Sequence, residues 1–140
     1  MRNDHVTIRS TAVFDLLAPE TAAVPVKVEL RYETLDPYAV VAAFRTGRHL
    51  VDWVFARDLL ADGLLGEAGD GDVRIRPSAD DPECVLFELN SPSGHAVFEA
   101  SAQELADFLD RTYDVVLPGN EHMWVTIDEA LTRLIPHDQG

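Results

Sequence analysis

A regular alternation of apolar and polar residues constrains this fold more than any other feature of the sequence. Between Val26 and Tyr32, apolar or aromatic side chains occupy every second position, and lysine, glutamate and arginine fill the positions between them. Because side chains alternate across an extended strand, one face of this strand is apolar and the other is charged. Turn-forming residues separate further short apolar runs, which lie at residues 6–14, 39–44, 51–55, 73–75, 85–89 and 96–100. The pattern predicts a succession of antiparallel strands.

Two of these runs carry more specific expectations. Residues 39–44 are apolar at every position, which is typical of a central strand buried on both faces. After a hairpin turn at Thr46–His49, the side chains of Val51, Trp53 and Phe55 are expected to point together into the core.

Helix signals follow the strand runs in both halves of the chain. Residues 57–62 are rich in helix formers, and Gly63 is expected to end this helix in the left-handed conformation that glycine favours. Ser101 and Glu104 match a capping box, so a second helix is expected to begin there. The segment Leu117–Asn120 contains proline and glycine and is expected to break it.

A last capping box, formed by Thr126 and Glu129, predicts a terminal helix that Pro136 would end. The expected class is therefore α+β, with one or more antiparallel sheets, the order ββββα-βββα-α, and helices packed on one side. The chain has 140 residues and 46% hydrophobic content, so residues 1–140 are expected to form a single domain.

The composition has a strong excess of negative charge, with 25 Asp and Glu against 11 Lys and Arg and a formal charge of -14. Such a chain repels polyanions, so nucleic-acid binding is disfavoured unless a local patch such as Arg74 and Arg76 overrides the overall charge. Cys84 is the only cysteine, and residues 1–5 lack the apolar core of a signal peptide, so a cytoplasmic protein is expected. No apolar run is long enough to predict a direct membrane span.

No motif for catalysis or for binding a metal or cofactor stands out. Asp70–Asp72 resembles a calcium loop only superficially, because the required ligand spacing does not continue beyond it. Cys84, between a glutamate and an apolar strand, is expected to stay a thiol. The histidines lack the spacing of a metal site; they are His5, His49, His95, His122 and His137. We therefore predict no catalytic residue, no cofactor, no metal and no enzymatic activity.

Several segments carry longer sequence motifs, in which the exact residues matter and not only their apolar or polar character. The most specific is the octet Trp53–Leu60, and Arg31–Val40 precedes it. Residues 71–77, 91–94 and 117–122 follow in order. Together these motifs resemble the SsgA-like proteins of actinobacteria over nearly the whole chain, and they are closest to the SsgB branch. The motif residues expected to specify the family fold are Tyr32, Asp36, Pro37, Tyr38, Trp53, Phe55, Arg57 and Asp58.

The resemblance implies a non-catalytic factor of cell division and sporulation. SsgB-type members help to position the ring of the tubulin-like protein FtsZ at future septum sites, with an SsgA-type partner, and they associate as homo-oligomers, here expected to be trimers. The family fold resembles a Whirly-type sheet. The implied protein is therefore a cytoplasmic protein-protein adaptor at the cell septum, with FtsZ and/or an SsgA-type protein as partner.

The motif residues also have a purely structural interpretation, which we favour. Trp53 and Phe55 can bury large apolar areas in the core, and Arg57 can neutralise a nearby aspartate or glutamate. On this interpretation the octet specifies the fold, and the partner surface lies elsewhere.

Apolar residues in loops are the candidates for that partner surface, because contiguous exposed apolar patches mark binding sites. Leu64 and Leu65 lie next to glycines, and Met123 and Trp124 lie between the last two predicted helices. The same four residues could instead anchor their loops on the core, and both interpretations stay open.

A second function class is a Whirly-type regulator that binds single-stranded nucleic acid. Such a site needs stacking aromatic residues interleaved with cations on one sheet face. The strand cations available for it are Arg9, Lys27, Arg31 and Arg45, and Glu29 interrupts them.

Overall fold

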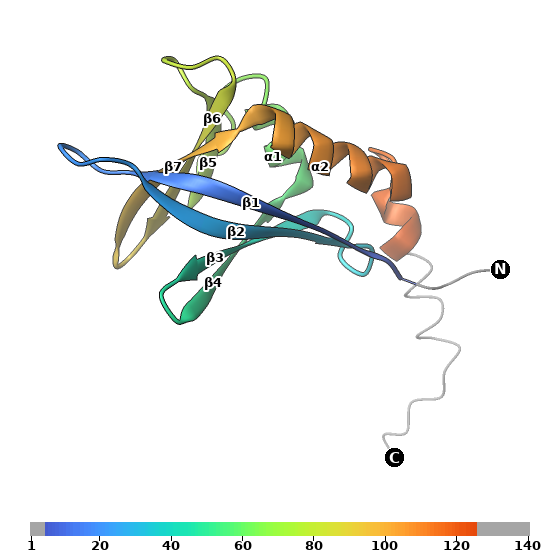
Figure 1. Cartoon of the computed structure of the whole chain (residues 1–140). Coiled ribbons are helices and arrows are strands. Elements are labelled where there is room, and N and C mark those ends of the chain that lie inside the picture. Colours follow the sequence, from blue (N-terminus) through green and yellow to red (C-terminus); the bar gives the residue numbers. More distant parts are fainter. Residues whose placement is uncertain (1–4, 126–140) are drawn as a thin grey trace.

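The computed structural model of the chain describes residues 5–125 (Figure 1). The strands are β1 (Thr7–Leu17), β2 (Val24–Glu33), β3 (Ala39–Thr46), β4 (His49–Ala56), β5 (Val73–Pro77), β6 (Cys84–Ser91) and β7 (Gly94–Ser101). The helices are α1 (Arg57–Gly63), between β4 and β5, and α2 (Ala102–Val115), after β7. This order confirms the predicted α+β class up to α2. The terminal helix predicted from Thr126, Glu129 and Pro136 lies outside the described residues.

All seven strands form one antiparallel sheet with the order β4-β3-β2-β1-β7-β6-β5. It consists of two meanders, β1 to β4 and β5 to β7, which meet where β1 pairs with β7. Only Asp15, Leu16 and Leu17 of β1 form this pairing, opposite residues 97–99. The sheet therefore has two edge strands, β4 and β5. The likeness to a Whirly-type sheet stays a prediction.

The sheet curls so that its apolar faces enclose the core. In β2, Val28, Leu30 and Tyr32 are buried, which confirms the alternation read from the sequence. Aromatic rings from different strands meet inside the curl: the Phe14 ring centroid lies 5.7 Å from that of Phe44, on β3, and 5.1 Å from that of Phe87, on β6. Pairs of this kind add about 1 kcal/mol each beyond the area that they bury. The aromatic contacts thus join the two meanders.

The two helices lie close together on one side of the sheet (Figure 1), where Leu60, Leu105 and Phe108 are buried. The predicted start of α2 is confirmed, since the Ser101 hydroxyl accepts a hydrogen bond from the Glu104 backbone N–H at 3.2 Å. The helix ends at Val115, before the predicted break.

Gly63 has a different role from the one predicted. It still belongs to α1 and has no positive φ, and the C-cap residue is Leu64, with a φ of -72° in the right-handed region. A Cβ at Gly63 would meet the Cβ of Ile75 at 2.5 Å. The prediction of a left-handed position is therefore wrong, and the glycine allows α1 to pack directly on β5.

The expectation for residues 51–55 is met only in part. The three side chains share one face of β4, with Phe55 buried and Trp53 partly buried, but Val51 is 43% exposed, so the prediction that it lies in the core is wrong. The reason is the place of β4 in the sheet: it is an edge strand that pairs only with β3, and Val51 lines an open hollow at its beginning. Alternation alone does not reveal which strand lies at an edge.

Candidate interaction surfaces

Arg57 forms the centre of a buried polar cluster. As the first residue of α1, it is only 1% exposed, and its Nη2 lies 2.7 Å from the Glu121 carboxylate. Its Nη1 donates to the backbone carbonyl of Val116 at 2.7 Å. The guanidinium also lies 4.9 Å from the ring centroids of both Tyr32 and Tyr113, a distance that permits cation-π attraction. The charge of this arginine is therefore neutralised inside the protein.

Glu121 is held in the ionised state by these neighbours. Burial raises the pKa of its carboxyl, but the hydrogen bond from Arg57, the charge of Arg57 and backbone donors that include the Gly119 N–H outweigh burial. The net pKa of Glu121 lies below its ordinary value. The Gly119 N–H lies 2.9 Å from the second carboxylate oxygen, which fixes the segment after α2 in place.

The turn between β2 and β3 is attached to the same cluster. The Tyr32 hydroxyl donates to the Pro37 carbonyl at 2.9 Å, and the Arg57 N–H donates to the Tyr38 carbonyl at 2.7 Å. Burial raises the pKa of Tyr32 to about 12, although Arg57 opposes the shift, so the hydroxyl stays protonated. Two segments distant in sequence, residues 32–38 and residues 112–121, thus converge on Arg57.

The eight motif residues divide by exposure. Tyr32, Pro37, Phe55 and Arg57 are buried, and Trp53 is partly buried. This placement supports the structural interpretation for these five. The side chains that reach solvent are Asp36, Tyr38 and Asp58.

The four interface candidates behave differently from one another. Leu64 and Trp124 are partly buried and pack against the core, Leu64 as a loop anchor and Trp124 from the helical residues 121–125. Leu65 is 88% exposed and Met123 is 51% exposed. Leu65 is the second residue after the end of α1. Met123 is the second residue after Glu121, which pairs with Arg57 at the start of α1. The structure therefore places the two exposed candidates near opposite ends of α1 and not in one patch.

Other exposed apolar residues, which sequence reasoning missed, lie close in sequence to the contacts of Arg57. Tyr38 bonds to Arg57 through its carbonyl, and Leu117 follows another carbonyl partner of Arg57. Leu35 belongs to the same turn as Tyr38. Each of four exposed residues lies within three positions of a residue that contacts Arg57, and we group them on this basis as the Arg57-end surface: Leu35, Tyr38, Leu117 and Met123. The signal that singled out Leu64, an apolar residue beside a turn former, is present at Leu35 and Leu117 too.

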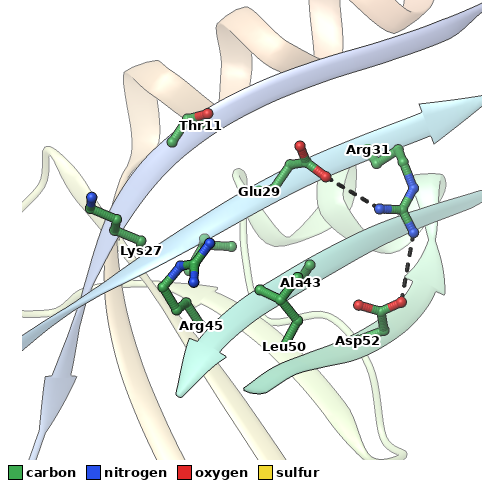
Figure 2. A pocket seen from close by; sticks show the side chains of 9 residues that line it. Thr11, Lys27, Glu29, Arg31, Ala43, Arg45, Leu50 and Asp52 are labelled. Atoms are coloured by element: carbon green, nitrogen blue, oxygen red, sulfur yellow. Dashed lines mark hydrogen bonds and ion pairs between the residues drawn. The ribbon is translucent and has the colours of Figure 1, made fainter. Parts of the chain in front are cut away.

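A second surface feature is a hollow on the outer face of β1 to β4 (Figure 2). Its volume is about 430 Å³, and Ala43 lies at its floor because its small side chain stands among longer ones. Arg31 crosses it, with its guanidinium 3.3 Å from Glu29 and 3.6 Å from Asp52.

This hollow bears directly on the nucleic-acid alternative. Lys27, Arg31 and Arg45 do share the outer face, but two carboxylates already neutralise Arg31. The residues that line the hollow include no aromatic side chain. A stacking platform of the kind that single-stranded nucleic acid requires is therefore missing from this hollow.

Among residues 5–125, no three or more His, Cys, Asp and Glu side chains come together in a way that could hold a metal ion. Partial desolvation and the nearby carboxylates of Glu99 and Asp81 raise the pKa of Cys84 to about 11, so its sulfur is a protonated thiol. None of the helices in the described part of the chain is long and apolar enough to cross a membrane.

Comparison with known proteins identifies relatives over almost the full length. The family described as "Streptomyces sporulation and cell division protein, SsgA" matches residues 26–121. The chain is 80% identical, over 99% of both chains, to the sporulation-specific cell division protein SsgB of Saccharopolyspora erythraea. It is 46% identical to SsgB of Streptomyces coelicolor, over 86% of this chain and 89% of that one.

Solved structures agree with these sequence matches. The SsgA-like sporulation-specific cell division protein of Thermobifida fusca superposes with a TM-score of 0.88 at 40% identity, covering 96% of this chain and all of that one. A structure described under mutations in SsgB that correlate to longitudinal cell division during sporulation of Streptomyces coelicolor has a TM-score of 0.81 at 43% identity, over 86% of this chain and 96% of that one. The chain therefore belongs to the SsgA-like family and to its SsgB branch.

Proposed function

We propose that this protein acts in sporulation-specific cell division as a non-catalytic, oligomeric adaptor that helps to position the FtsZ ring at septum sites. The observation that carries the proposal is the 80% identity, over 99% of both chains, to a protein named sporulation-specific cell division protein SsgB. At that identity the fold, the core and most surface residues are shared. The adaptor role places the protein in the cytoplasm at the septum.

The surface of the molecule supports an adaptor. An adaptor needs exposed apolar residues for its partners, since such patches mark protein-protein contacts. The Arg57-end surface supplies four of them, and Leu65 is a separate exposed leucine beyond α1. FtsZ, an SsgA-type protein and further copies of the chain are the partners to test.

Co-sedimentation with assembled FtsZ from the same organism tests the proposal. The wild-type protein, with its mass in solution measured by light scattering, is expected to pellet with the polymer, directly or when an SsgA-type partner is added. Replacing Met123 and Leu117 with glutamate is expected to reduce pelleting. A matched control is Val24→Ser, which changes an exposed valine near the β1–β2 turn, away from this surface.

Failure of the wild-type protein to pellet, with the SsgA-type partner also present, would refute FtsZ positioning through this protein. Pelleting that the Met123 and Leu117 variants leave unchanged would keep the function but remove the Arg57-end surface from it. Circular dichroism of each variant checks that a lost interaction is not a lost fold.

A further inference from the structure

The two edges of the sheet are protected to different degrees. Residues before β5 cover its outer edge, since the Ala68 N–H donates to the Ile75 carbonyl at 2.9 Å and the Ile75 N–H donates back at 3.0 Å. β5 is also short and ends at Pro77. These are common ways to prevent an edge strand from pairing with another chain.

β4 has none of these protections in the region that the structure describes. It is eight residues long, contains no proline, glycine or lysine, and pairs only with β3. An extended edge strand with unpaired backbone N–H and C=O groups is a template to which a further strand can be added.

The outer face of β4 indicates what kind of strand would fit. Leu50 and Val54 are about as exposed as each other, at 60% and 59%, and Asp52 lies between them on the same face. Figure 2 shows Leu50 and Asp52 at the rim of the hollow, with the Asp52 carboxylate directed to Arg31. That contact is 3.6 Å long and leaves about half of the Asp52 side chain exposed. A complementary added strand would place a basic side chain beside Asp52 and apolar side chains beside Leu50 and Val54.

The inner face of β4 is apolar, so the added strand would need apolar side chains on that face too. Val51 and Trp53 line a second hollow of about 290 Å³, which lies between the start of β4 and the β6–β7 hairpin. Leu89, Ala96 and Phe98 line its other side. The alternate residues of an added strand would therefore meet apolar surface there.

Charge decides between a partner protein and a second copy of this chain. If two β4 strands paired antiparallel with Leu50 opposite Val54, Asp52 would face the same residue of the other copy. Two carboxylates at that position would repel each other, and the formal charge of -14 attracts basic segments of other proteins. A basic partner is the better match.

We propose that the free edge of β4 binds an extended basic segment of a partner protein by strand addition. The segment carries a Lys or Arg opposite Asp52, apolar residues two positions before and after it, and apolar residues at the positions between. This inference deepens the proposed adaptor role and rests on it only for the identity of the partner.

The test measures fluorescence anisotropy of a labelled peptide with the full-length protein. The peptide has a central arginine flanked on each side by two valines and then serines. We expect saturable binding that weakens about tenfold when glutamate replaces the arginine, because a like charge then faces Asp52. N-methylation of alternate backbone amides is expected to abolish binding, because it removes the donors that strand addition requires. Asp52→Arg should reverse the preference between the two peptides, whereas Asp107→Arg, the same charge change on α2, should not.

Three results would overturn the proposal: no saturable binding of the arginine peptide, equal binding of its N-methylated form, or a fall in the mass of the protein on Asp52→Arg with peptide binding unchanged. The last result would assign the edge to a second copy. The assay contains no FtsZ, so the two proposals fail separately. If the protein binds the peptide but does not pellet with FtsZ, the β4 site stands and the proposed function is refuted. If it pellets with FtsZ but does not bind the peptide, only the β4 site is refuted.

Discussion

Arg57 combines burial, charge and three kinds of contact in one side chain. It bonds to a carboxylate and to backbone carbonyls, and two tyrosine rings flank its guanidinium. Its Nε is the one buried side-chain nitrogen or oxygen without a hydrogen-bond partner among the described residues. Breaking a buried ion pair costs more than the pair contributes, because the remaining charge loses its compensation. The residue is therefore far more sensitive to substitution than a surface arginine.

We expect Arg57→Lys to lower the free energy of unfolding by about 2–4 kcal/mol, although the charge is conserved. A lysine ammonium cannot reach the Glu121 carboxylate and the Val116 carbonyl at once with the flat geometry of a guanidinium. Urea denaturation at pH 7 measures the difference. Arg45→Lys on the exposed outer face is the control and should change stability by less than about 0.5 kcal/mol. Equal effects of the two substitutions would contradict the structural role of the cluster.

The ion pair also predicts a dependence of stability on pH. The pKa of Glu121 is lower in the folded protein than its ordinary value of 4.5. Its contribution to stability is therefore present above pH about 4.5 and is lost as the pH falls through the folded pKa. Glu121→Gln cannot titrate, so it should be less stable than the wild type at pH 7, and the gap should narrow as the pH falls through the folded-state pKa of Glu121, below its ordinary value of 4.5. Urea denaturation at several pH values measures the gap, and a gap that stayed constant would show that Glu121 is not the titrating group.

At the scale of elements, local patterns predicted what depends on neighbours in sequence. The alternation in β2 assigned its buried face, and Ser101 with Glu104 located the start of α2. Local patterns could not predict the contacts between segments that are distant in sequence. No pattern near Arg57 identifies Glu121 as its partner, and no pattern near Gly63 reveals that Ile75 packs against it. Both depend on how the two meanders and the helices meet in space.

Gly63 illustrates this at the junction of α1 and β5. In an exposed helix, replacing glycine with alanine stabilises by about 1 kcal/mol. Here we expect Gly63→Ala to destabilise by about 1–3 kcal/mol, because the new methyl group overlaps Ile75. Thermal denaturation measures the change. Gly66→Ala is the matched control, since nothing lies within 4 Å of a Cβ there, and it should leave the melting temperature almost unchanged. A stabilised Gly63→Ala variant would mean that α1 can move away from β5 at no cost.

At the scale of the whole molecule, the charge of -14 governs association. Copies of the chain repel one another, and dissolved salt screens the repulsion. We therefore expect the mass of the protein measured by light scattering to rise between about 20 mM and 500 mM salt. Binding of a basic peptide should weaken over the same range, because salt screens that attraction too. A mass that falls with salt would indicate that opposite charges hold the copies together.

The narrow pairing between β1 and β7 has a consequence for how the molecule forms. Within each meander, neighbouring strands follow one another along the chain, so their hairpins can close early and locally. The three residue pairs that join β1 to β7 come from strands far apart in sequence, and forming them requires closing a long loop. Closure of this seam is therefore expected to limit the rate of folding. In the native protein it is also the place where the two halves would first separate.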